Sequence, residues 1–201
     1  MISVVDIGLG NFMSVANILK KIGYEVKLEN HYDKISNSNI IILPGVGRFD
    51  VFMDELKKNR LDLALKNAYH NNSKILGICV GMHVLLDESE EGNSEGLKLI
   101  KGKVNKFSLN DKKIKVPHMG WNKVKISQSN KNEFNNFEDS KFYFIHSYYA
   151  KPTLTENIVG TTVHGHEFAS IIKKNNIYGV QFHPEKSHNY GKFFFKKFLN
   201  A

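Results

Sequence analysis

The sequence predicts an α/β fold in which a central, mostly parallel sheet carries helices on both faces and gains antiparallel strands in its second half. Short, almost wholly apolar runs, such as IIIL at 40–43 and KILGI at 74–78, are typical of parallel strands buried on both faces. Segments with helical spacing of apolar residues separate these runs, as expected when helices join the strands. After Gly92, strand-like pieces separated by turns replace the helical segments, which favours antiparallel pairing.

The first half is expected to begin with a strand, a glycine turn and a helix. ISVVDI at 2–7 is a β-branched run, and Gly8-Leu9-Gly10 turns the chain into a helix at 14–22 whose apolar residues recur about every 3.6 positions. Asn11 is placed to cap this helix and Gly23 to end it. The other elements expected before Gly92 are strands at 24–28, 40–43 and 74–78, a glycine-rich loop at 44–50, and helices at 50–71 and 81–89.

The second half is expected to be antiparallel β-structure closed by a helix. Its strand-like pieces lie at 97–107, 113–127, 141–150, 157–165 and 167–182. The polar, asparagine-rich segment 128–140 is expected to form an exposed loop, and 189–200 a helix that packs Phe194, Phe195 and Phe198 inward. Because no repeat or linker divides the chain, we expect one domain spanning residues 1–201.

The composition is typical of a soluble cytoplasmic protein. A chain with a single cysteine forms no internal disulfide bond, which fits a reducing compartment. The N-terminus is apolar but lacks the basic region of a signal peptide, and no apolar run approaches the roughly 20 residues of a membrane helix. We therefore expect a cytoplasmic protein without a membrane segment.

Charge and histidine content allow nucleic-acid or metal binding but do not favour either. The formal net charge is +8, yet the lysines are spread along the chain and no nucleic-acid-binding motif accompanies them. An acidic protein partner explains this charge at least as well, so no nucleic-acid partner is expected. The chain has nine histidines but no second cysteine and no helical H-x-x-x-H pattern, so neither a metal nor a cofactor is expected.

The only cysteine lies in GICVG, between an apolar strand and a predicted helix. A buried structural thiol is the simple explanation of a lone cysteine. The G-x-C-x-G pattern is, however, the cysteine counterpart of the nucleophile elbow, in which small residues let the strand and helix pass closely. Cys79 would lie at a helix N-terminus, which favours a thiolate, and the Val80 N–H would face a developing oxyanion.

A candidate base follows late in the chain, in GVQFHPEKS at 179–187. His183 and Glu185 lie two positions apart at the end of an apolar strand, so both side chains can face the same way. An isolated His-Pro-Glu is typical of a turn with a capping acid. Together with a cysteine elbow, it indicates a triad in which Cys79 is the nucleophile, His183 the base and Glu185 the carboxylate that orients the base.

On these motifs the chain resembles the class I, or triad, glutamine amidotransferases, and among them the glutaminase subunits of imidazole glycerol phosphate synthases. The matching segments span almost the full length: GLGN at 8–11, PGVGRF at 44–49, GICVGM at 77–82, ESEEG at 88–92, PHMGWN at 117–122, YFIHSYYA at 143–150 and QFHPEKS at 181–187. The resemblance implies a flavodoxin-like α/β domain that hydrolyses glutamine to glutamate and ammonia. It also implies a heterodimer with a (β/α)₈ cyclase subunit that receives the ammonia for histidine biosynthesis.

The resemblance further implies roles for particular residues. Val46 is expected to supply a second oxyanion N–H beside that of Val80. Positions that match glutamine-binding groups are Gly47, His83, Glu91, Ser147 and Tyr148. Positions that match the face toward the cyclase are Gly10, Asn11, Met119, Trp121, Tyr143 and Lys186. Core packing explains Trp121 and Tyr143 equally well.

One position departs from the family pattern, because His83 stands where the family usually has glutamine. Imidazole is shorter than that side chain and can carry a charge, so the affinity for glutamine or its pH dependence is expected to differ. The departure is also compatible with a paralogue that supplies ammonia for amidine formation on a surface sugar, and the sequence does not separate these uses.

Two other classes of protein fit parts of the chain. GLGNFM follows a strand, opens a helix and precedes Glu29 by about twenty residues, as in a dinucleotide-binding fold, but Met13 stands where the third glycine belongs. A partner-binding subunit without activity is the second alternative. The intact set of Cys79, His183 and Glu185 is evidence against it.

Overall fold

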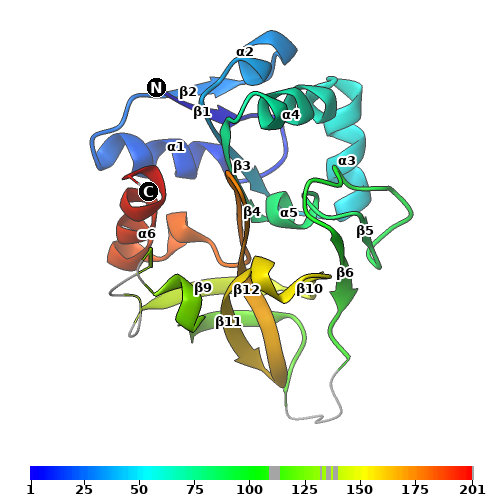
Figure 1. Ribbon diagram of the computed structural model, residues 1–201, viewed down its shortest axis with the longest axis vertical. Helices are drawn as coiled ribbons and strands as arrows, with labels where there is room; N and C mark the ends of the chain where they lie inside the picture. Colours follow the sequence, from blue (N-terminus) through cyan, green and yellow to red (C-terminus); the bar gives the residue numbers. More distant parts are fainter. Residues whose placement is uncertain (109–113, 132, 135–136, 138–139, 201) are drawn as a thin grey trace.

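The computed structural model describes residues 1–108, 114–131, 133–134, 137 and 140–200, and it has the predicted α/β architecture (Figure 1). One sheet has eleven strands: β1 (Ile2–Val5), β2 (Val26–Glu29), β3 (Ile40–Gly45), β4 (Lys74–Cys79), β5 (Glu88–Ser89), β6 (Gly102–Lys106), β8 (Lys125–Ile126), β10 (Tyr148–Pro152), β11 (Ile158–His164), β12 (His166–Lys174) and β13 (Ile177–Val180). The second sheet pairs β7 (His118–Lys123) with β9 (Lys141–His146).

The strand pairing changes along the large sheet as the sequence predicts. The order is β2-β1-β3-β4-β13-β12-β10-β6-β5, with β11 and then β8 attached beside β12. Pairing from β2 to β13 is parallel, whereas β12, β10 and β11 pair antiparallel with their neighbours. The mostly parallel sheet with added antiparallel strands is confirmed.

Helices cover both faces of the parallel part. They are α1 (Phe12–Lys21), α2 (Tyr32–Ser36), α3 (Phe49–Lys58), α4 (Leu61–His70), α5 (Val80–His83) and α6 (His188–Asn200). α1 and α6 lie on one face of the sheet, and α3, α4 and α5 on the other (Figure 1). The core between these layers includes the fully buried strand residues Ile41, Ile42 and Leu76. Phe194, Phe195 and Phe198 of α6 are buried, as predicted.

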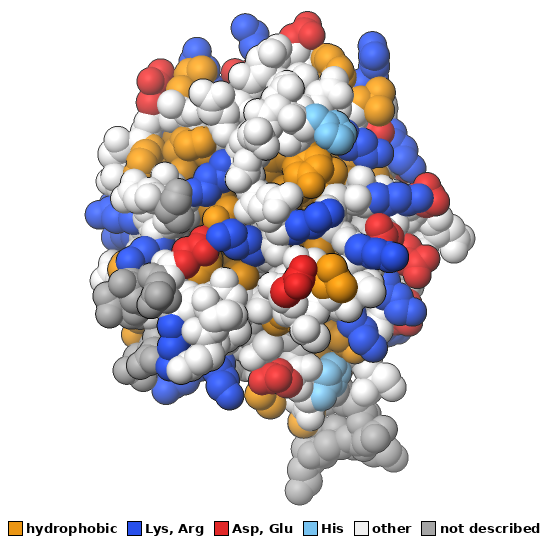
Figure 2. All heavy atoms as spheres, viewed as in Figure 1, with side chains coloured by type: hydrophobic (Ala, Val, Ile, Leu, Met, Phe, Trp, Pro, Cys, Tyr) orange, Lys and Arg blue, Asp and Glu red, His pale blue; other side chains and the backbone are white. Residues whose placement is uncertain are grey.

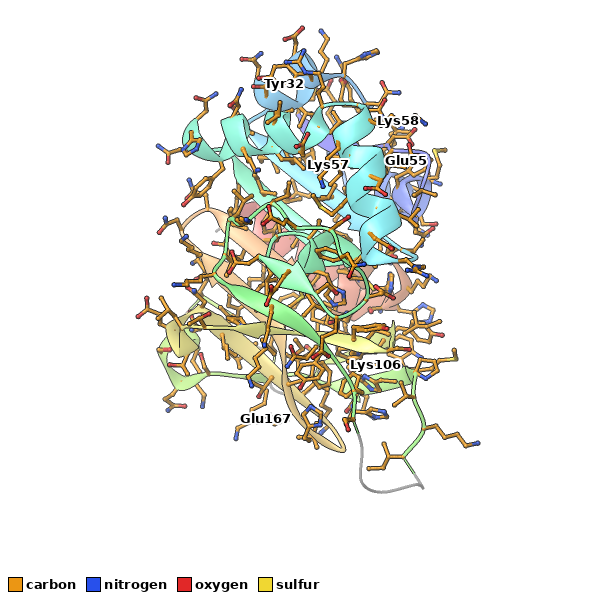
Figure 3. All side chains as sticks on the ribbon, turned by 90° about the vertical axis from the view of Figure 1, so that its right-hand side faces the viewer. Tyr32, Glu55, Lys57, Lys58, Lys106 and Glu167 are labelled. Atoms are coloured by element: carbon orange, nitrogen blue, oxygen red, sulfur yellow. The ribbon has the colours of Figure 1, made fainter. Side chains whose placement is uncertain are left out.

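The ends of the molecule differ in structure. Figure 3 places Tyr32 at the end formed by α2, and Lys106 and Glu167 at the opposite end, where the antiparallel strands lie. Lysine and arginine side chains are scattered over the face drawn in Figure 2 without forming one patch. In the part of the chain that the structure describes, no helix is both long and apolar enough to cross a membrane.

Two predicted helices are shorter than expected. The helix expected at 50–71 is interrupted by Arg60, which has a left-handed backbone (φ 57°) and separates α3 from α4. The helix expected at 81–89 ends at His83, and residues 88–89 form a strand instead. The carbonyls of Val84 and Leu85 accept hydrogen bonds from the N–H groups of Leu97 and Leu99, which removes the acceptors that a longer helix would need.

The second half also differs from the predictions in detail. The strand expected from residue 97 begins only at Gly102, because residues 97–100 make the contacts just described. The segment expected as one strand at 141–150 passes from the small sheet to the large one at Ser147. An exposed loop at 128–140 was the wrong expectation for Phe134 and Phe137, which are buried; several other residues of that segment lie outside the described part.

Candidate active site

Cys79 is the last residue of β4 and forms a sharp turn into α5, which begins at Val80. Its backbone is strained (φ 54°, ψ −111°), as expected for a nucleophile elbow. A Cβ atom at Gly77 would lie 2.3 Å from the Gly81 carbonyl oxygen, and one at Gly81 would lie 1.9 Å from the Leu43 carbonyl oxygen. Both glycines are therefore required by the close approach of α5 to the strands beneath it.

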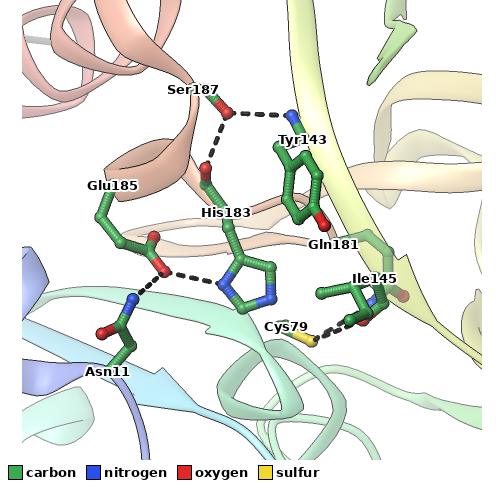
Figure 4. Close-up of polar contacts among 8 residues, drawn as sticks. All are labelled: Asn11, Cys79, Tyr143, Ile145, Gln181, His183, Glu185 and Ser187. Carbon is green, nitrogen blue, oxygen red and sulfur yellow. Dashed lines mark hydrogen bonds and ion pairs between the residues drawn. The ribbon is translucent and has the colours of Figure 1, made fainter. Parts of the chain in front are cut away.

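His183 and Glu185 meet next to this turn (Figure 4). Nδ1 of His183 and Oε1 of Glu185 are 2.8 Å apart, and the two side chains are only 2% and 1% exposed. The imidazole edge away from Glu185 faces Cys79 (Figure 4). The structure therefore brings the three predicted catalytic residues together, with the histidine between the thiol and the carboxylate.

Neighbouring backbone and hydroxyl groups hold the histidine in place. The N–H of His183 donates to the Tyr143 carbonyl oxygen at 2.9 Å. Oγ of Ser187 donates to the His183 carbonyl oxygen at 2.7 Å and accepts the N–H of Tyr143 at 3.0 Å (Figure 4). Ser187 was not predicted as a site residue, although it ends the QFHPEKS motif at 181–187.

The electrostatics favour a charged histidine beside the sulfur. Burial lowers the pKa of His183, but the adjacent Cys79 and Glu185 outweigh burial and raise that pKa to about 10. An imidazolium at neutral pH holds a proton that can be given to a leaving group. The arrangement is thus suited to nucleophilic catalysis by sulfur with proton transfer through His183.

Asn11 does not cap α1 through its side chain, which was the predicted role. Its Nδ2 instead donates to Oε1 of Glu185 at 3.1 Å, so one carboxylate oxygen serves both Asn11 and His183. The other oxygen, Oε2, is buried without a hydrogen-bond partner among the described residues. Asn11 therefore belongs to the surroundings of the triad.

A cavity of about 240 Å³ opens at Cys79 and collects the other predicted site residues. The residues that line it are Val46, Gly47, Cys79, Val80, His83, Glu91, Ile145, His146, Ser147, Tyr148, His183 and Lys186. Both predicted oxyanion residues and all five predicted glutamine-binding residues are among them. A larger groove of about 1090 Å³ runs along β8 and β11 and is lined by none of the predicted site residues.

His83 is buried in the wall of this cavity and is not charged at neutral pH. It is 2% exposed, and burial lowers its pKa to about 4 despite a hydrogen bond to Gln181. Nε2 of His83 lies 2.7 Å from Oε1 of Gln181, whereas Nδ1 is buried and has no hydrogen-bond partner in the part of the chain that the structure describes. The expectation that a charge on His83 makes glutamine binding pH-dependent is therefore wrong at neutral pH.

Gln181 is a site residue that was not predicted from the sequence. Its amide nitrogen lies 3.9 Å from Sγ of Cys79, and its oxygen faces His83. Gln181 belongs to the QFHPEKS motif, but only its contact with the Cys79 sulfur distinguishes it from a core residue.

Glu91 is held by the N–H of Phe49, which donates to Oε2 at 3.0 Å, and burial raises the pKa of Glu91.

The residues expected to face a partner include exposed side chains of β7 and side chains that contact one another near the triad. Met119 and Trp121 of β7 are 59% and 45% exposed, so core packing is the wrong explanation for Trp121. The Trp121 ring stacks on His188, and Nζ of Lys186 lies 6.0 Å from the centre of the Tyr143 ring. A Cβ at Gly10 would lie 3.1 Å from the Pro44 carbonyl oxygen, so the glycine turn near the N-terminus packs against the PGVG segment.

Comparisons with known proteins agree with this geometry. The family model of class I glutamine amidotransferases matches residues 3–201. The chain is 46% identical over 200 residues to a Methanococcus maripaludis protein named imidazole glycerol phosphate synthase subunit HisH 2, covering 99% of this chain and 98% of that one. It is 40% identical over 209 residues to a protein named imidazole glycerol phosphate synthase subunit HisH from Neisseria meningitidis serogroup B, covering 98% of each chain.

Solved structures with lower identity share the fold. A crystal structure described as a glutamine amidotransferase superposes with a TM-score of 0.77 at 15% identity, covering 99% of this chain and 97% of that one. The structure of PurLQS from Thermotoga maritima gives a TM-score of 0.75 at 19% identity, again covering 99% of this chain and 97% of that one.

Within the described residues, no group of three or more histidine, cysteine, aspartate or glutamate side chains is arranged to hold a metal ion.

Proposed function

This chain belongs to the class I glutamine amidotransferase family, and we propose that it hydrolyses glutamine to glutamate and ammonia through Cys79, His183 and Glu185. The observation that carries the proposal is the arrangement of these residues. A cysteine on a strained turn faces a buried histidine, and both line a cavity of about 240 Å³. The far nitrogen of that histidine lies 2.8 Å from the Glu185 carboxylate. Such a set of groups performs acyl transfer.

In the first half-reaction, the Cys79 sulfur attacks the side-chain carbonyl carbon of glutamine. The C–S bond forms as the carbonyl electrons move to oxygen, and the N–H groups of Val80 and Val46 stabilise that oxyanion. The C–N bond then breaks. His183 gives the proton on Nε2 to the departing nitrogen, which leaves as ammonia, while Glu185 holds Nδ1 and so fixes the tautomer.

In the second half-reaction, water attacks the thioester. Nε2 of His183 removes a proton from that water, the C–S bond breaks, and glutamate leaves as the thiolate and imidazolium pair is restored. Gly47, Glu91, Ser147 and Tyr148 line the same cavity and are proposed to bind glutamine. His83 is proposed to accept a hydrogen bond from the α-ammonium group through its unpartnered Nδ1.

The ammonia is used by a partner subunit. The relatives are named as subunits of imidazole glycerol phosphate synthase, which supports an ammonia-consuming cyclase as the partner and histidine biosynthesis as the pathway. We propose a heterodimer in which a (β/α)₈ cyclase forms imidazole glycerol phosphate and AICAR. The names of these relatives give no support to the surface-sugar alternative.

The partner is proposed to dock on the side of the triad that carries the exposed residues of β7. Met119 and Trp121 offer apolar surface there, and Lys186 offers a positive charge close to Tyr143. Gly10 and Asn11 extend this surface toward Glu185. The cyclase face is accordingly expected to be partly acidic, in keeping with the +8 net charge of this chain.

The experiment that tests this function is chemical labelling combined with one substitution. A glutamine-like electrophile is expected to modify Cys79 alone and to abolish glutamate release. Cys79→Ser in the complex is expected to lose glutamine-dependent turnover and keep turnover with free ammonium, because cyclisation takes place on the other subunit. Glutamine-dependent turnover by Cys79→Ser would refute the triad.

A further inference from the structure

Two buried histidines beside the cavity form a chain of hydrogen bonds that the catalytic mechanism does not use. His118 of β7 and His146 of β9 are partners across the small sheet and are 4% and 6% exposed. Nδ1 of His118 lies 2.9 Å from Nε2 of His146. The chain continues in both directions, to Nδ2 of Asn122 at 3.2 Å from His118 and to the Tyr148 carbonyl oxygen at 2.7 Å from His146.

The direction of every hydrogen bond in this chain is fixed by its two ends. The Tyr148 carbonyl can only accept, so Nδ1 of His146 carries a hydrogen and Nε2 is an acceptor. His118 must then donate from Nδ1, which leaves its Nε2 to accept from Asn122. The Asn122 oxygen accepts the N–H of Lys123 at 2.8 Å, so its amide nitrogen is the donor.

Both imidazoles are neutral in this arrangement, as their surroundings require. Burial lowers the pKa of His118 to about 4, and nearby His164 lowers it further. Burial also lowers the pKa of His146 well below its ordinary value, and His118 adds to that shift. Aromatic rings hold the pair in place: His118 stacks on Phe144 at 4.8 Å and on His164 at 4.2 Å. The chain therefore has one stable pattern of donors and acceptors.

The chain ends at the corner that carries two proposed glutamine-binding residues. β9 ends at His146 and β10 begins at Tyr148, so the backbone changes sheets at Ser147. Ile145, His146, Ser147 and Tyr148 all line the cavity with Cys79. Strand pairing also holds the corner, because Tyr148 of β10 is in register with Lys106 of β6 and the Phe107 N–H donates to the Ser147 carbonyl oxygen at 3.1 Å. The bond from His146 to the Tyr148 carbonyl adds a side-chain restraint to this backbone pairing.

We propose that His118 and His146 are positioning residues for glutamine: through the directed chain from Asn122 to the Tyr148 carbonyl, they fix the Ser147–Tyr148 corner in its substrate-binding conformation. This inference rests on the proposed glutaminase function. It gives the two histidines a role in the affinity for glutamine and none in the chemical step. Loss of their directed hydrogen bonds therefore raises KM with little change in kcat.

The two nitrogens of each ring can be removed separately. An asparagine amide lies where Nδ1 of a histidine lies, and a glutamine amide lies where Nε2 lies. His118→Asn keeps the donor toward His146, whereas His118→Gln loses it. His146→Asn keeps the donor toward the Tyr148 carbonyl, and His146→Gln loses it. Each pair is matched in polarity and burial, so a general packing defect affects both members alike.

The experiment measures kcat and KM for glutamine in the assembled complex, with the unfolding temperature and the ammonium-dependent rate as controls. His118→Gln and His146→Gln are expected to raise KM about 5- to 30-fold, the factor for one buried hydrogen bond, with kcat within about twofold. The asparagine variants are expected to stay within about threefold of the wild-type KM.

Three outcomes would overturn the inference: equal KM values within each pair, an effect confined to kcat, or failure of all four variants to fold, since the last would make the pair purely structural. If His118→Gln or His146→Gln fails to fold, the KM values of the asparagine and glutamine variants at the other position test the inference. A wild-type complex that releases no glutamate would instead refute the proposed function, so the two failures are distinguishable.

Discussion

Replacing Glu185 by glutamine tests how the triad histidine is oriented, and the structure predicts a moderate effect that depends on Asn11. In Glu185→Gln, the amide oxygen is expected to take the place of Oε1, because that position lies 3.1 Å from the Asn11 amide donor and 2.8 Å from Nδ1 of His183. The His183 tautomer is then kept, and only the negative charge is lost.

The size of the effect follows from the kind of hydrogen bond. A hydrogen bond to a charged group is worth about 1.5–3 kcal/mol and a neutral one about 0.5–1.5 kcal/mol, so the substitution removes about 1–2 kcal/mol. That loss corresponds to a decrease in kcat of about 5- to 30-fold. Without Asn11, the amide can turn its nitrogen toward His183, and the decrease approaches the about 10⁴-fold loss caused by a wrong tautomer.

The assay is glutamate release by the complex for the wild type, Glu185→Gln, Asn11→Ala and the double variant, with the ammonium-dependent rate as the control for assembly. The double variant is expected to be at least about tenfold slower than the product of the two single effects, because the residues share one oxygen. A loss of about 10⁴-fold in Glu185→Gln alone, with no further change on removing Asn11, would refute this account.

Further predictions concern His83, the oxyanion segment and the elbow glycines. His83→Gln is expected to lower KM for glutamine with little change in kcat, and the wild-type KM should show no titration of His83 between about pH 6 and 8, because its pKa is about 4; a KM unaffected by the substitution would count against a direct contact. Because that pKa lies below the unfolded value of about 6.5, His83 contributes stability that is present above pH 6.5 and lost as the pH falls toward 4. His83 should contribute up to about 1.4 kcal/mol per pH unit to the slope seen in denaturant titrations. His83→Gln should remove that share and leave the shares of His118 and His146, whose pKa values are also lowered. The isolated chain is expected to release glutamate about 10²–10³-fold more slowly than the complex with cyclase ligand if the peptide between Gly45 and Val46 rests with its carbonyl toward Cys79; equal rates in both states would exclude such gating. Gly81→Ala is expected to prevent folding or displace α5, because the new Cβ would lie 1.9 Å from the Leu43 carbonyl oxygen, and a wild-type circular dichroism spectrum with full activity would contradict this.

The elements with strong local signals were predictable from sequence, and so were the triad residues. Buried runs such as 40–43 and 74–78 became parallel strands because apolar side chains on both faces fit only the middle of a covered sheet. Cys79 and His183 belong to motifs whose spacing sets the backbone conformation. In each case a few consecutive residues determine the structure.

Features that depend on contacts between distant segments were not predictable. The helix after Cys79 is short because residues 97–100 take its backbone acceptors, and no local pattern announces this. Phe134 and Phe137 are buried within a segment that reads as polar. Likewise, the neutral state of His83 and the contact between Asn11 and Glu185 follow from burial and tertiary packing, which single-residue chemistry does not reveal.

The pairing of Gly45 with Cys79 limits how the oxyanion segment can move. Register places these residues opposite each other at the ends of β3 and β4, and α3 begins at Phe49, so only Val46, Gly47 and Arg48 lie between two anchored elements. Three residues between two anchored elements are too few to form a loop that opens and closes as a lid. They allow a crankshaft rotation of one peptide plane, with compensating changes in the torsion angles on either side and both anchors stationary. Structures of active and resting states should therefore share the positions of β3 and α3 and differ within residues 45–48.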